Sequence, residues 1–192
     1  MRLLILKIHE SLPSRVLPLV SEEYGDEECA RRYRAVVLTT LRQLRGLVNT
    51  RVRILADPDD AAEALRFWLL PRLADRWQAE DSIYRADGWE IEFGDSGGKF
   101  TVEAHGDVLC PFLSARWVHT AMLGLDRGAH RVSGPASNGG EYFHARCVSV
   151  GETLDIRELP CLPIICDDYQ WNEALQSLLG PSLKRAWEEE IQ

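Results

Sequence analysis

The sequence predicts an α/β protein, a three-layer α/β/α sandwich with a mostly parallel central sheet, on three observations. Residues 3–8 form a continuous apolar run that contains only Lys7 as a charge, which is typical of a strand buried on both faces of a parallel sheet. Over residues 27–47 the apolar positions recur at three- and four-residue steps, the pattern of an amphipathic helix. A second short strand over 52–56 and a helical pattern over 61–70 complete a β-α-β-α order, which predicts parallel strands covered by helices.

Length and composition indicate a single domain over residues 1–192, because 45% hydrophobic and 27% charged residues are the composition of a globular chain with a sizeable core. The formal net charge of −8 argues against nucleic acid as a partner, since phosphate backbones are bound by clustered Lys and Arg. The five cysteines include no C-x-x-C pair, which indicates reduced thiols rather than disulfides or zinc ligands. No segment has the length of a membrane span or the pattern of a signal peptide, so we expect a cytoplasmic protein.

The charged residues near these elements fit helix ends better than metal sites. The acidic run over 22–28 precedes the first helix, where carboxylates favour the positive end of the helix dipole. The acidic residues over 57–60 offer caps for the second helix, and Pro71 is expected to end it.

The middle of the chain predicts an extra antiparallel hairpin. Residues 89–93 and 100–104 both alternate strictly between apolar and polar, and a glycine-rich stretch over 94–99 joins them. This glycine-rich stretch lacks the spacing of a phosphate-binding loop, so we interpret it as a turn.

Asp107 follows as the only carboxylate of the 105–113 segment. A carboxylate at the end of a central strand is well placed to hold a hard divalent cation such as Mg²⁺ together with substrate phosphates. His105 and His119 are the neighbouring candidate ligands, and we interpret both as hydrogen-bonded structural residues.

The glycine-rich segment over 134–143 has two interpretations. Adjacent glycines let backbone amides approach a ligand closely, which predicts a loop at a binding crevice. The Asn138-Gly139 pair is equally typical of a tight hairpin turn, which local pattern alone favours.

The last part of the chain predicts strands over 142–150 and 162–166, then helices near 171–179 and over 182–191. Asp167 and Asp168 precede the first of these helices. Their carboxylates either stabilise the N-terminus of this helix, which we favour, or are a second source of carboxylates for a metal.

Several segments, in this order, resemble a bacterial family of GT-A-type nucleotide-diphospho-sugar transferase-like proteins, a group related in fold to cofactor guanylyltransferases. The ordered series carries the resemblance rather than any one segment. The similar segments are residues 14–21 (SRVLPLVS), 31–44, 52–68, 110–113 (CPFL), 134–142 (GPASNGGEY), and Asp168 with 173–175.

The resemblance implies a sugar nucleotide that lies across the strand ends, with its diphosphate bridged by Mg²⁺ or Mn²⁺ and no organic cofactor. The implied metal ligands are Asp107 and Asp168. The implied substrate-binding residues are Lys7, Arg15, Gly134, Gly139 and Gly140.

The departures from the family pattern concern charged positions. Leu109 stands where the metal-binding aspartate is expected, and Asp107, two residues earlier on the same strand face, is its possible replacement. Asn138 replaces an aspartate and loses the charge needed for proton abstraction, while Glu141 offers a carboxylate from another direction. Asn138 and Glu141 are the two candidate catalytic residues.

Three functions follow from the resemblance. The favoured one is a nucleotide-sugar-binding domain with weak or lost glycosyltransferase activity, because metal affinity depends on ligand charge and number. The others are an active metal-dependent glycosyltransferase and a guanylyltransferase-like nucleotidyltransferase that uses the same crevice.

Overall fold

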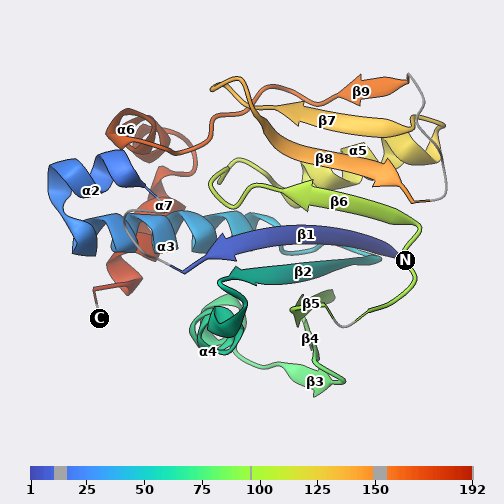
Figure 1. The fold of residues 1–192 in the computed structure, drawn as a ribbon, viewed down its shortest axis with the longest axis horizontal. Coiled ribbons are helices and arrows are strands. Elements are labelled where there is room, and N and C mark those ends of the chain that lie inside the picture. The colour runs from blue at the N-terminus through green and yellow to red at the C-terminus, as the bar shows by residue number, and fades with distance from the viewer. Residues whose placement is uncertain (11–16, 96, 149–154, 192) are drawn as a thin grey trace.

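The computed structural model describes residues 1–10, 17–95, 97–148 and 155–191, which form one mixed sheet with its helices (Figure 1). The strands are β1 (Arg2–His9), β2 (Thr50–Asp57), β3 (Gln78–Glu80), β4 (Ile83–Ala86), β5 (Trp89–Phe93), β6 (Val102–Gly106), β7 (Arg131–Pro135), β8 (Glu141–Cys147) and β9 (Ile156–Glu158). The helices are α2 (Pro18–Tyr24), α3 (Asp26–Gln43), η1 (Asp59–Ala61, a 3₁₀ turn), α4 (Ala62–Leu73), α5 (Ala115–Asp126), α6 (Asp168–Gln176) and α7 (Gly180–Glu189). Within these ranges no helix is both long and apolar enough to cross a membrane.

The sheet order is β3-β4-β5-β2-β1-β6-β8-β7-β9. Its four central strands β5, β2, β1 and β6 are all parallel, so the predicted α/β class with a mostly parallel core is confirmed. Antiparallel pairs flank this core, with β3, β4 and β5 on one side and β6, β8 and β7 on the other.

The core lies between the sheet and the helices behind it. Leu4 on β1 aligns with Val52 on β2 and with Ala104 on β6, and all three are fully buried. They belong to one buried cluster with Val37 and Leu41 of α3. Burial of these apolar side chains is the main stabilising contribution to the fold.

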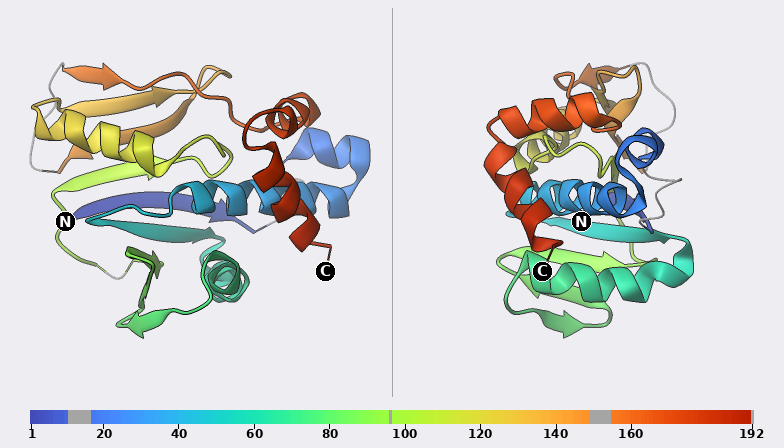
Figure 2. Two further views of the ribbon diagram at one scale, coloured as in Figure 1. Left: turned by 180° about the vertical axis from the view of Figure 1, so that it is seen from behind. Right: turned by 90° about the vertical axis from the view of Figure 1, so that its left-hand side faces the viewer.

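The helices are distributed unevenly over the two faces of the sheet. Figure 2 shows α3, α5 and α7 over one face, whereas in Figure 1 no helix of the described residues lies over the front of β1, β6 and β8. The arrangement therefore differs from an even three-layer sandwich. Because alternate residues of a strand point to opposite faces, the uncovered face carries Glu103 and His105 of β6 beside Leu3 and Ile5 of β1.

Buried ion pairs stabilise part of this uncovered face. Arg51 and Arg53 of β2 donate to the carboxylate of Glu92 on β5, at 3.2 and 2.6 Å. The Glu92 side chain has no exposed surface, and the Phe100 ring lies against both guanidinium groups, at 5.8 and 5.4 Å from its centroid. The charges are thus paired and shielded from water.

The predicted hairpin between residues 89–93 and 100–104 is wrong. β5 and β6 lie on opposite sides of the β2-β1 pair, and each runs parallel to its central neighbour. Alternation in β5 reflects the paired, buried carboxylate of Glu92 and not a wet face. The antiparallel partner of β5 is β4, through the turn at Asp87-Gly88.

Two further predictions, the end of α4 at Pro71 and a strand over residues 162–166, differ from the structure at proline residues. α4 continues past Pro71 to Leu73, because a proline in the last turn removes only one helical hydrogen bond and side chains cover nearby carbonyls. The Arg72 and Trp77 side chains donate to the Trp68 and Leu70 carbonyls, at 3.1 and 2.7 Å. Residues 162–166 form only an isolated bridge, from Leu162 to Ala136, since Pro163 has no N–H to donate to a strand.

Candidate functional site

A cavity of about 340 Å³ lies at the carboxyl ends of β1 and β6, beside the start of β8. We call it the strand-end cavity. Its walls include three of the residues predicted from the sequence, namely Lys7, Asp107 and Glu141. In open sheets with parallel strands, ligands bind at this edge, where loops leave the carboxyl ends of the strands.

Asp107 lies directly after β6 and faces the cavity while being held by backbone groups. Its carboxylate accepts the N–H of Leu109 at 2.8 Å, and its own N–H donates to the Tyr142 carbonyl at 2.8 Å. Burial raises the pKa of the Asp107 carboxyl, because desolvation disfavours the charged form. Asp107 is thus an acceptor held in place by the Leu109 N–H, and its charged form destabilises the folded state.

Lys7 and His9 share one carboxylate at the ends of β1 and β2. Lys7 Nζ lies 2.7 Å and His9 Nδ1 3.0 Å from Asp57 Oδ2. Neither η1 nor α4 has a side-chain cap hydrogen bond, so the predicted capping by residues 57–60 is wrong, and Asp57 holds the cavity wall instead. Lys7 remains more than half exposed and presents its ammonium group to the cavity.

Tyr33 of α3 closes the cavity from the helix side. Its hydroxyl oxygen accepts the His9 N–H at 2.9 Å, which ties α3 to the end of β1. Burial raises the pKa of the Tyr33 phenol, so the side chain stays neutral.

Glu141 and His144 form the wall that β8 contributes. Glu141 Oε2 accepts from Arg131 Nη2 at 2.8 Å, and His144 Nδ1 lies 3.8 Å from the same oxygen. The His144 ring stacks on His105 of β6 with centroids 4.7 Å apart. Burial, and then the neighbouring His105, lower the pKa of His144, so its imidazole is neutral at pH 7.

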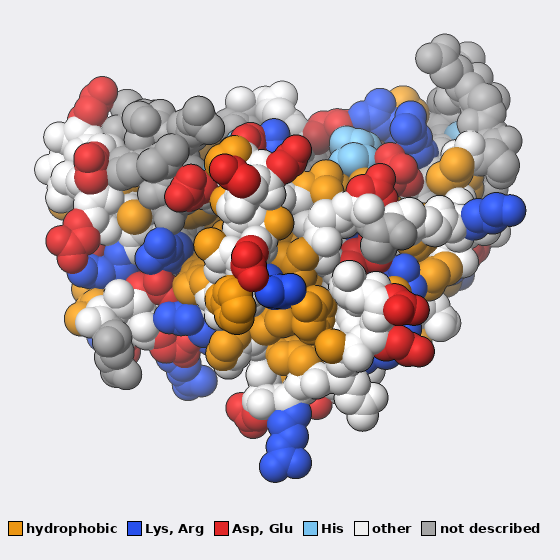
Figure 3. Space-filling model, turned by 60° about the horizontal axis from the view of Figure 1, so that its bottom comes forward, with side chains coloured by type: hydrophobic (Ala, Val, Ile, Leu, Met, Phe, Trp, Pro, Cys, Tyr) orange, Lys and Arg blue, Asp and Glu red, His pale blue; other side chains and the backbone are white. Residues whose placement is uncertain are grey.

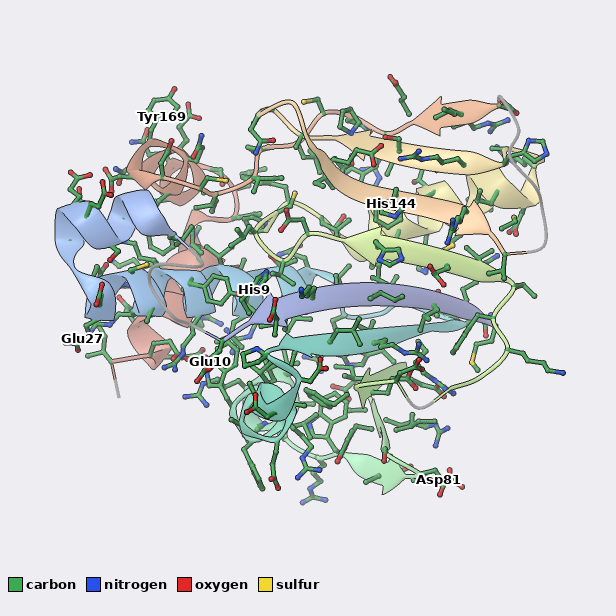
Figure 4. The ribbon with its side chains drawn as sticks, viewed as in Figure 1. His9, Glu10, Glu27, Asp81, His144 and Tyr169 are labelled. Carbon is green, nitrogen blue, oxygen red and sulfur yellow. The ribbon has the colours of Figure 1, made fainter. Side chains whose placement is uncertain are left out.

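His9 and His144, which Figure 4 labels at the end of β1 and on β8, are cavity residues that the sequence reasoning did not select. His9 was detectable, because it ends the apolar run of β1 and must therefore lie at the carboxyl edge of the sheet. His144 carried no such signal, since its place depends on the pairing of β8 with β6.

The segment over 134–143 is a β-hairpin. β7 and β8 pair antiparallel, Ala136 N–H donates to the Gly140 carbonyl at 2.7 Å, and Gly139 occupies the turn with φ +90°. The Asn138 side chain accepts the Gly140 N–H at 3.2 Å. Local sequence pattern thus indicated the conformation correctly.

The glycines of this hairpin lie outside the wall of the strand-end cavity, as does Asn138. Gly134 has a packing role, because a Cβ there would lie 2.6 Å from the ring of buried Tyr142. Arg15, the remaining predicted substrate-binding residue, lies outside the described residues.

Asp168 is engaged by two donors away from Asp107. It accepts from Arg32 Nη1 and Asn172 Nδ2, each at 2.7 Å. Asp167 caps α6 by accepting the Gln170 N–H at 2.9 Å, and the Gln170 side chain returns a bond to the Asp167 N–H. The predicted role at the helix N-terminus is confirmed for Asp167.

The residues present do not fit a preformed metal site. Across the described ranges no three His, Cys, Asp or Glu side chains are grouped so that they could hold a metal ion. Asp107 is a single carboxylate with a raised pKa, and Glu141 is bound to Arg131. Without substrate phosphates, these two carboxylates do not supply the several oxygen ligands that a hard divalent cation needs.

A second cavity, of about 290 Å³, adjoins the first and shares His9 and Tyr33 with it. We call it the α4 cavity, because Leu65 and Trp68 of α4 form its apolar wall. Figure 3 shows hydrophobic side chains gathered on the face over α4 and β3–β5. Both cavities combine polar and apolar side chains, and together they extend across the strand ends.

Comparison with known proteins supports the fold. No protein-family model matches the sequence, and no curated protein is significantly similar to it. A crystal structure of a candidate nucleotide-diphospho-sugar transferase from Desulfovibrio desulfuricans G20 is similar over 100% of this chain and 97% of that chain, with 15% identity and a TM-score of 0.68.

Two other solved structures are more distant. A 4-diphosphocytidyl-2C-methyl-D-erythritol synthase from Anaerococcus prevotii DSM 20548 shares 11% identity over 92% of this chain and 96% of its own, with a TM-score of 0.49. Rv0371c from Mycobacterium tuberculosis H37Rv, in complex with manganese, shares 13% identity over 93% of this chain and 100% of its own, with a TM-score of 0.45. The match to the Desulfovibrio structure shows that the chain has the fold of that candidate nucleotide-diphospho-sugar transferase.

Proposed function

We propose that the protein is a nucleotide-sugar-binding domain with weak or lost glycosyltransferase activity. The observation that carries the proposal is the strand-end cavity, where Lys7, His9 and Asp107 converge at the carboxyl edge of the parallel strands. Lys7 supplies an ammonium group for a diphosphate, and Asp107 an acceptor for sugar hydroxyls. The α4 cavity receives the nucleoside against Trp68.

The charges of the site favour binding over transfer. Departure of a nucleoside diphosphate requires stabilisation of developing negative charge, for which transferases of this kind commonly use a metal ion. Asp168 accepts from Arg32, and Glu141 accepts from Arg131. The pKa of Asp107 is raised, and Asn138 supplies no charge. The proposal therefore involves no resident cation.

An active glycosyltransferase is the second candidate, and the pair of Glu141 and His144 favours it. A neutral imidazole beside a carboxylate is able to take a proton from an acceptor hydroxyl. His144 lines the strand-end cavity and its pKa is lowered, which meets this requirement at pH 7.

Calorimetric titration with UDP-, GDP-, ADP- and TDP-sugars, each with and without Mn²⁺, tests the proposal. We expect at least one sugar nucleotide to bind without Mn²⁺ and to raise the melting temperature, since a ligand at 100 times its Kd stabilises the native state by about 2.7 kcal/mol. Lys7→Ala should weaken this binding by at least tenfold. The matched control is Lys99→Ala, an exposed lysine that has no ion pair in the described residues.

Two results would decide against the proposal. Absence of binding across the panel, or equal binding by Lys7→Ala and the control, contradicts a nucleotide-sugar site in the strand-end cavity. Release of nucleoside diphosphate at an enzymatic rate, lost in His144→Gln, would instead support the active transferase.

A further inference from the structure

A separate cavity of about 680 Å³, twice the volume of the strand-end cavity, lies where the ends of α3 and α4 meet α7. We call it the arginine cavity. Figure 2 shows α7 crossing α3, with α4 near the lower end of α7, and no residue that lines the arginine cavity also lines the strand-end cavity. Three carboxylates line the cavity, against five arginines: Arg42, Arg45, Arg72, Arg76 and Arg185. Such a local excess of positive charge contrasts with the net charge of −8 for the whole chain.

Three of the arginines are neutralised by carboxylates. Arg42 Nη2 pairs with Glu189 at 2.7 Å, and Arg72 Nε pairs with Glu190 at 3.2 Å. Arg45 pairs with Asp87. These three arginines hold the ends of α3 and α4 against neighbouring elements.

Arg76 and Arg185 are different, because neither makes an ion pair, a side-chain hydrogen bond or a ring contact within the described residues. Both are exposed and line the same cavity from separate elements, Arg76 after α4 and Arg185 on α7. A guanidinium group is a planar fork of donors that matches phosphate oxygens, so two unpaired ones at one cavity favour an anionic ligand.

One side of α7 adds a further donor to the same wall. Ser182, whose hydroxyl is a donor, lines the cavity together with Arg185 and Glu189, which lie three and seven residues further along this ten-residue helix and therefore on the same face.

An adjoining cavity of about 620 Å³ shares Arg76 and Asp87 with the arginine cavity. Its wall contains Trp77 and Trp89, whose ring centroids lie 6.1 Å apart. The Trp89 indole N–H is buried and has no hydrogen-bond partner among the described residues. Aromatic walls beside a phosphate-binding group suit a ligand that also carries a flat ring.

We propose that the arginine cavity binds an oligophosphate, with Arg76 and Arg185 as the contacting residues. Two sources share this chemistry: inorganic oligophosphate, and a nucleoside triphosphate whose ring lies against Trp77 in the adjoining cavity. Polynucleotides are disfavoured because the chain as a whole is acidic. The site is independent of the strand-end cavity and of the function proposed for it.

Isothermal titration with tripolyphosphate and with ATP, at about 150 mM salt, tests the proposal. We expect at least one of them to bind, and Arg76→Ala with Arg185→Ala to weaken it by at least tenfold. Tighter binding of ATP than of tripolyphosphate would identify the nucleoside triphosphate as the source. Arg127→Ala is the matched control, an exposed arginine after α5 with no ion pair in the described residues, and should bind as the parent protein does.

Because both arginines are exposed, the double variant should keep the parent melting curve, so loss of binding would not reflect unfolding. The two sites are separated by the converse measurement: Arg76→Ala with Arg185→Ala should leave sugar-nucleotide binding at the strand-end cavity unchanged. Three results would overturn the proposal: no binding at millimolar ligand, equal binding by the double variant and the control, or tighter arginine-dependent binding of a single-stranded oligonucleotide.

Discussion

Asp107 shows how a single side chain can weaken the fold at the place where it forms a site. Its carboxyl is buried at the end of a central strand and meets one N–H donor, that of Leu109. Protein interiors disfavour such a charge unless it is paired. An uncompensated acceptor in a cavity is typical of binding sites, which commonly trade stability for function.

We therefore expect Asp107→Asn to stabilise the protein at pH 7. The folded-state pKa of Asp107 is raised, so its contribution is favourable below the unfolded pKa of about 3.9 and is lost as pH rises through the folded value. The amide keeps the acceptor for Leu109 and removes the charge. Urea unfolding should show a gain near pH 7 that disappears below about pH 4. A gain that is equal at both pH values would contradict this cause.

Glu92 is the opposite case, a buried charge with full compensation. It bonds to Arg51 and Arg53 and has no exposed surface. Removing one partner of a buried ion pair leaves the other charges desolvated, which costs roughly 3–5 kcal/mol.

Glu92→Gln should therefore lower the free energy of unfolding by about 3 kcal/mol in urea denaturation. Glu80→Gln is the control, since Glu80 pairs with Arg85 on the surface and is 74% exposed. Its loss should change stability by less than about 1 kcal/mol. Equal effects of the two substitutions would show that the network on the uncovered face is not buried in solution.

At the scale of elements, the β7-β8 hairpin contains a glycine, Gly134, whose lack of a side chain is required for packing. Gly134 lies under the Tyr142 ring, whose hydroxyl donates to the Pro160 carbonyl at 3.1 Å. The close contact fixes the hairpin against the segment that leads to α6. This role differs from the ligand contact that the sequence predicts for Gly134.

Gly134→Ala should lower the stability by about 1–3 kcal/mol, because the added methyl group overlaps a ring that cannot move freely. Gly140→Ala is a matched control in the same hairpin, where the new Cβ would meet only Asn138 Oδ1 at 3.4 Å. Thermal unfolding of both variants measures the difference. A destabilised Gly140→Ala with an unchanged Gly134→Ala would contradict the packing role.

The whole molecule is closed by its last helix, which joins α3 and α4 through side chains. The Glu190 carboxylate, 4% exposed, accepts from Trp68 Nε1 at 3.0 Å and pairs with Arg72 at 3.2 Å and Arg34 at 3.5 Å. On α7 itself, Trp187 donates to Glu28 of α3 at 3.2 Å. A residue close to the end of the sequence thus connects both helices.

Glu190→Ala should reduce the free energy of unfolding by about 2–4 kcal/mol, because it removes the buried carboxylate that Arg72 and the Trp68 indole N–H share. The control is Glu188→Ala, whose carboxylate is 54% exposed and lies 4.0 Å from Lys184. Chemical denaturation of both variants tests this prediction. Equal decreases in the free energy of unfolding would contradict the role of Glu190 in connecting α3 and α4.

The sequence predicted the elements that depend on local pattern. β1, β2 and α3 were detectable from apolar runs and helical spacing, and the capping role of Asp167 from its position. The partners of β5 were not, because strand pairing depends on distant segments and alternation does not distinguish a wet face from a buried ion pair. Asp107 follows from its position at the end of a strand, and Lys7 and Glu141 follow from the family resemblance, whereas His144 requires the pairing of β8 with β6.

The two outermost strands have a consequence for how the sheet meets other chains. β3 and β9 are three residues long and fully exposed, and each carries charged or amide side chains. A long unpaired strand offers a row of N–H and C=O groups that templates aggregation. Because both edge strands of the sheet are short and carry polar side chains, they offer few backbone groups to a strand of another chain. Substitutions that lengthen β9 with apolar residues should therefore raise the tendency to form fibres.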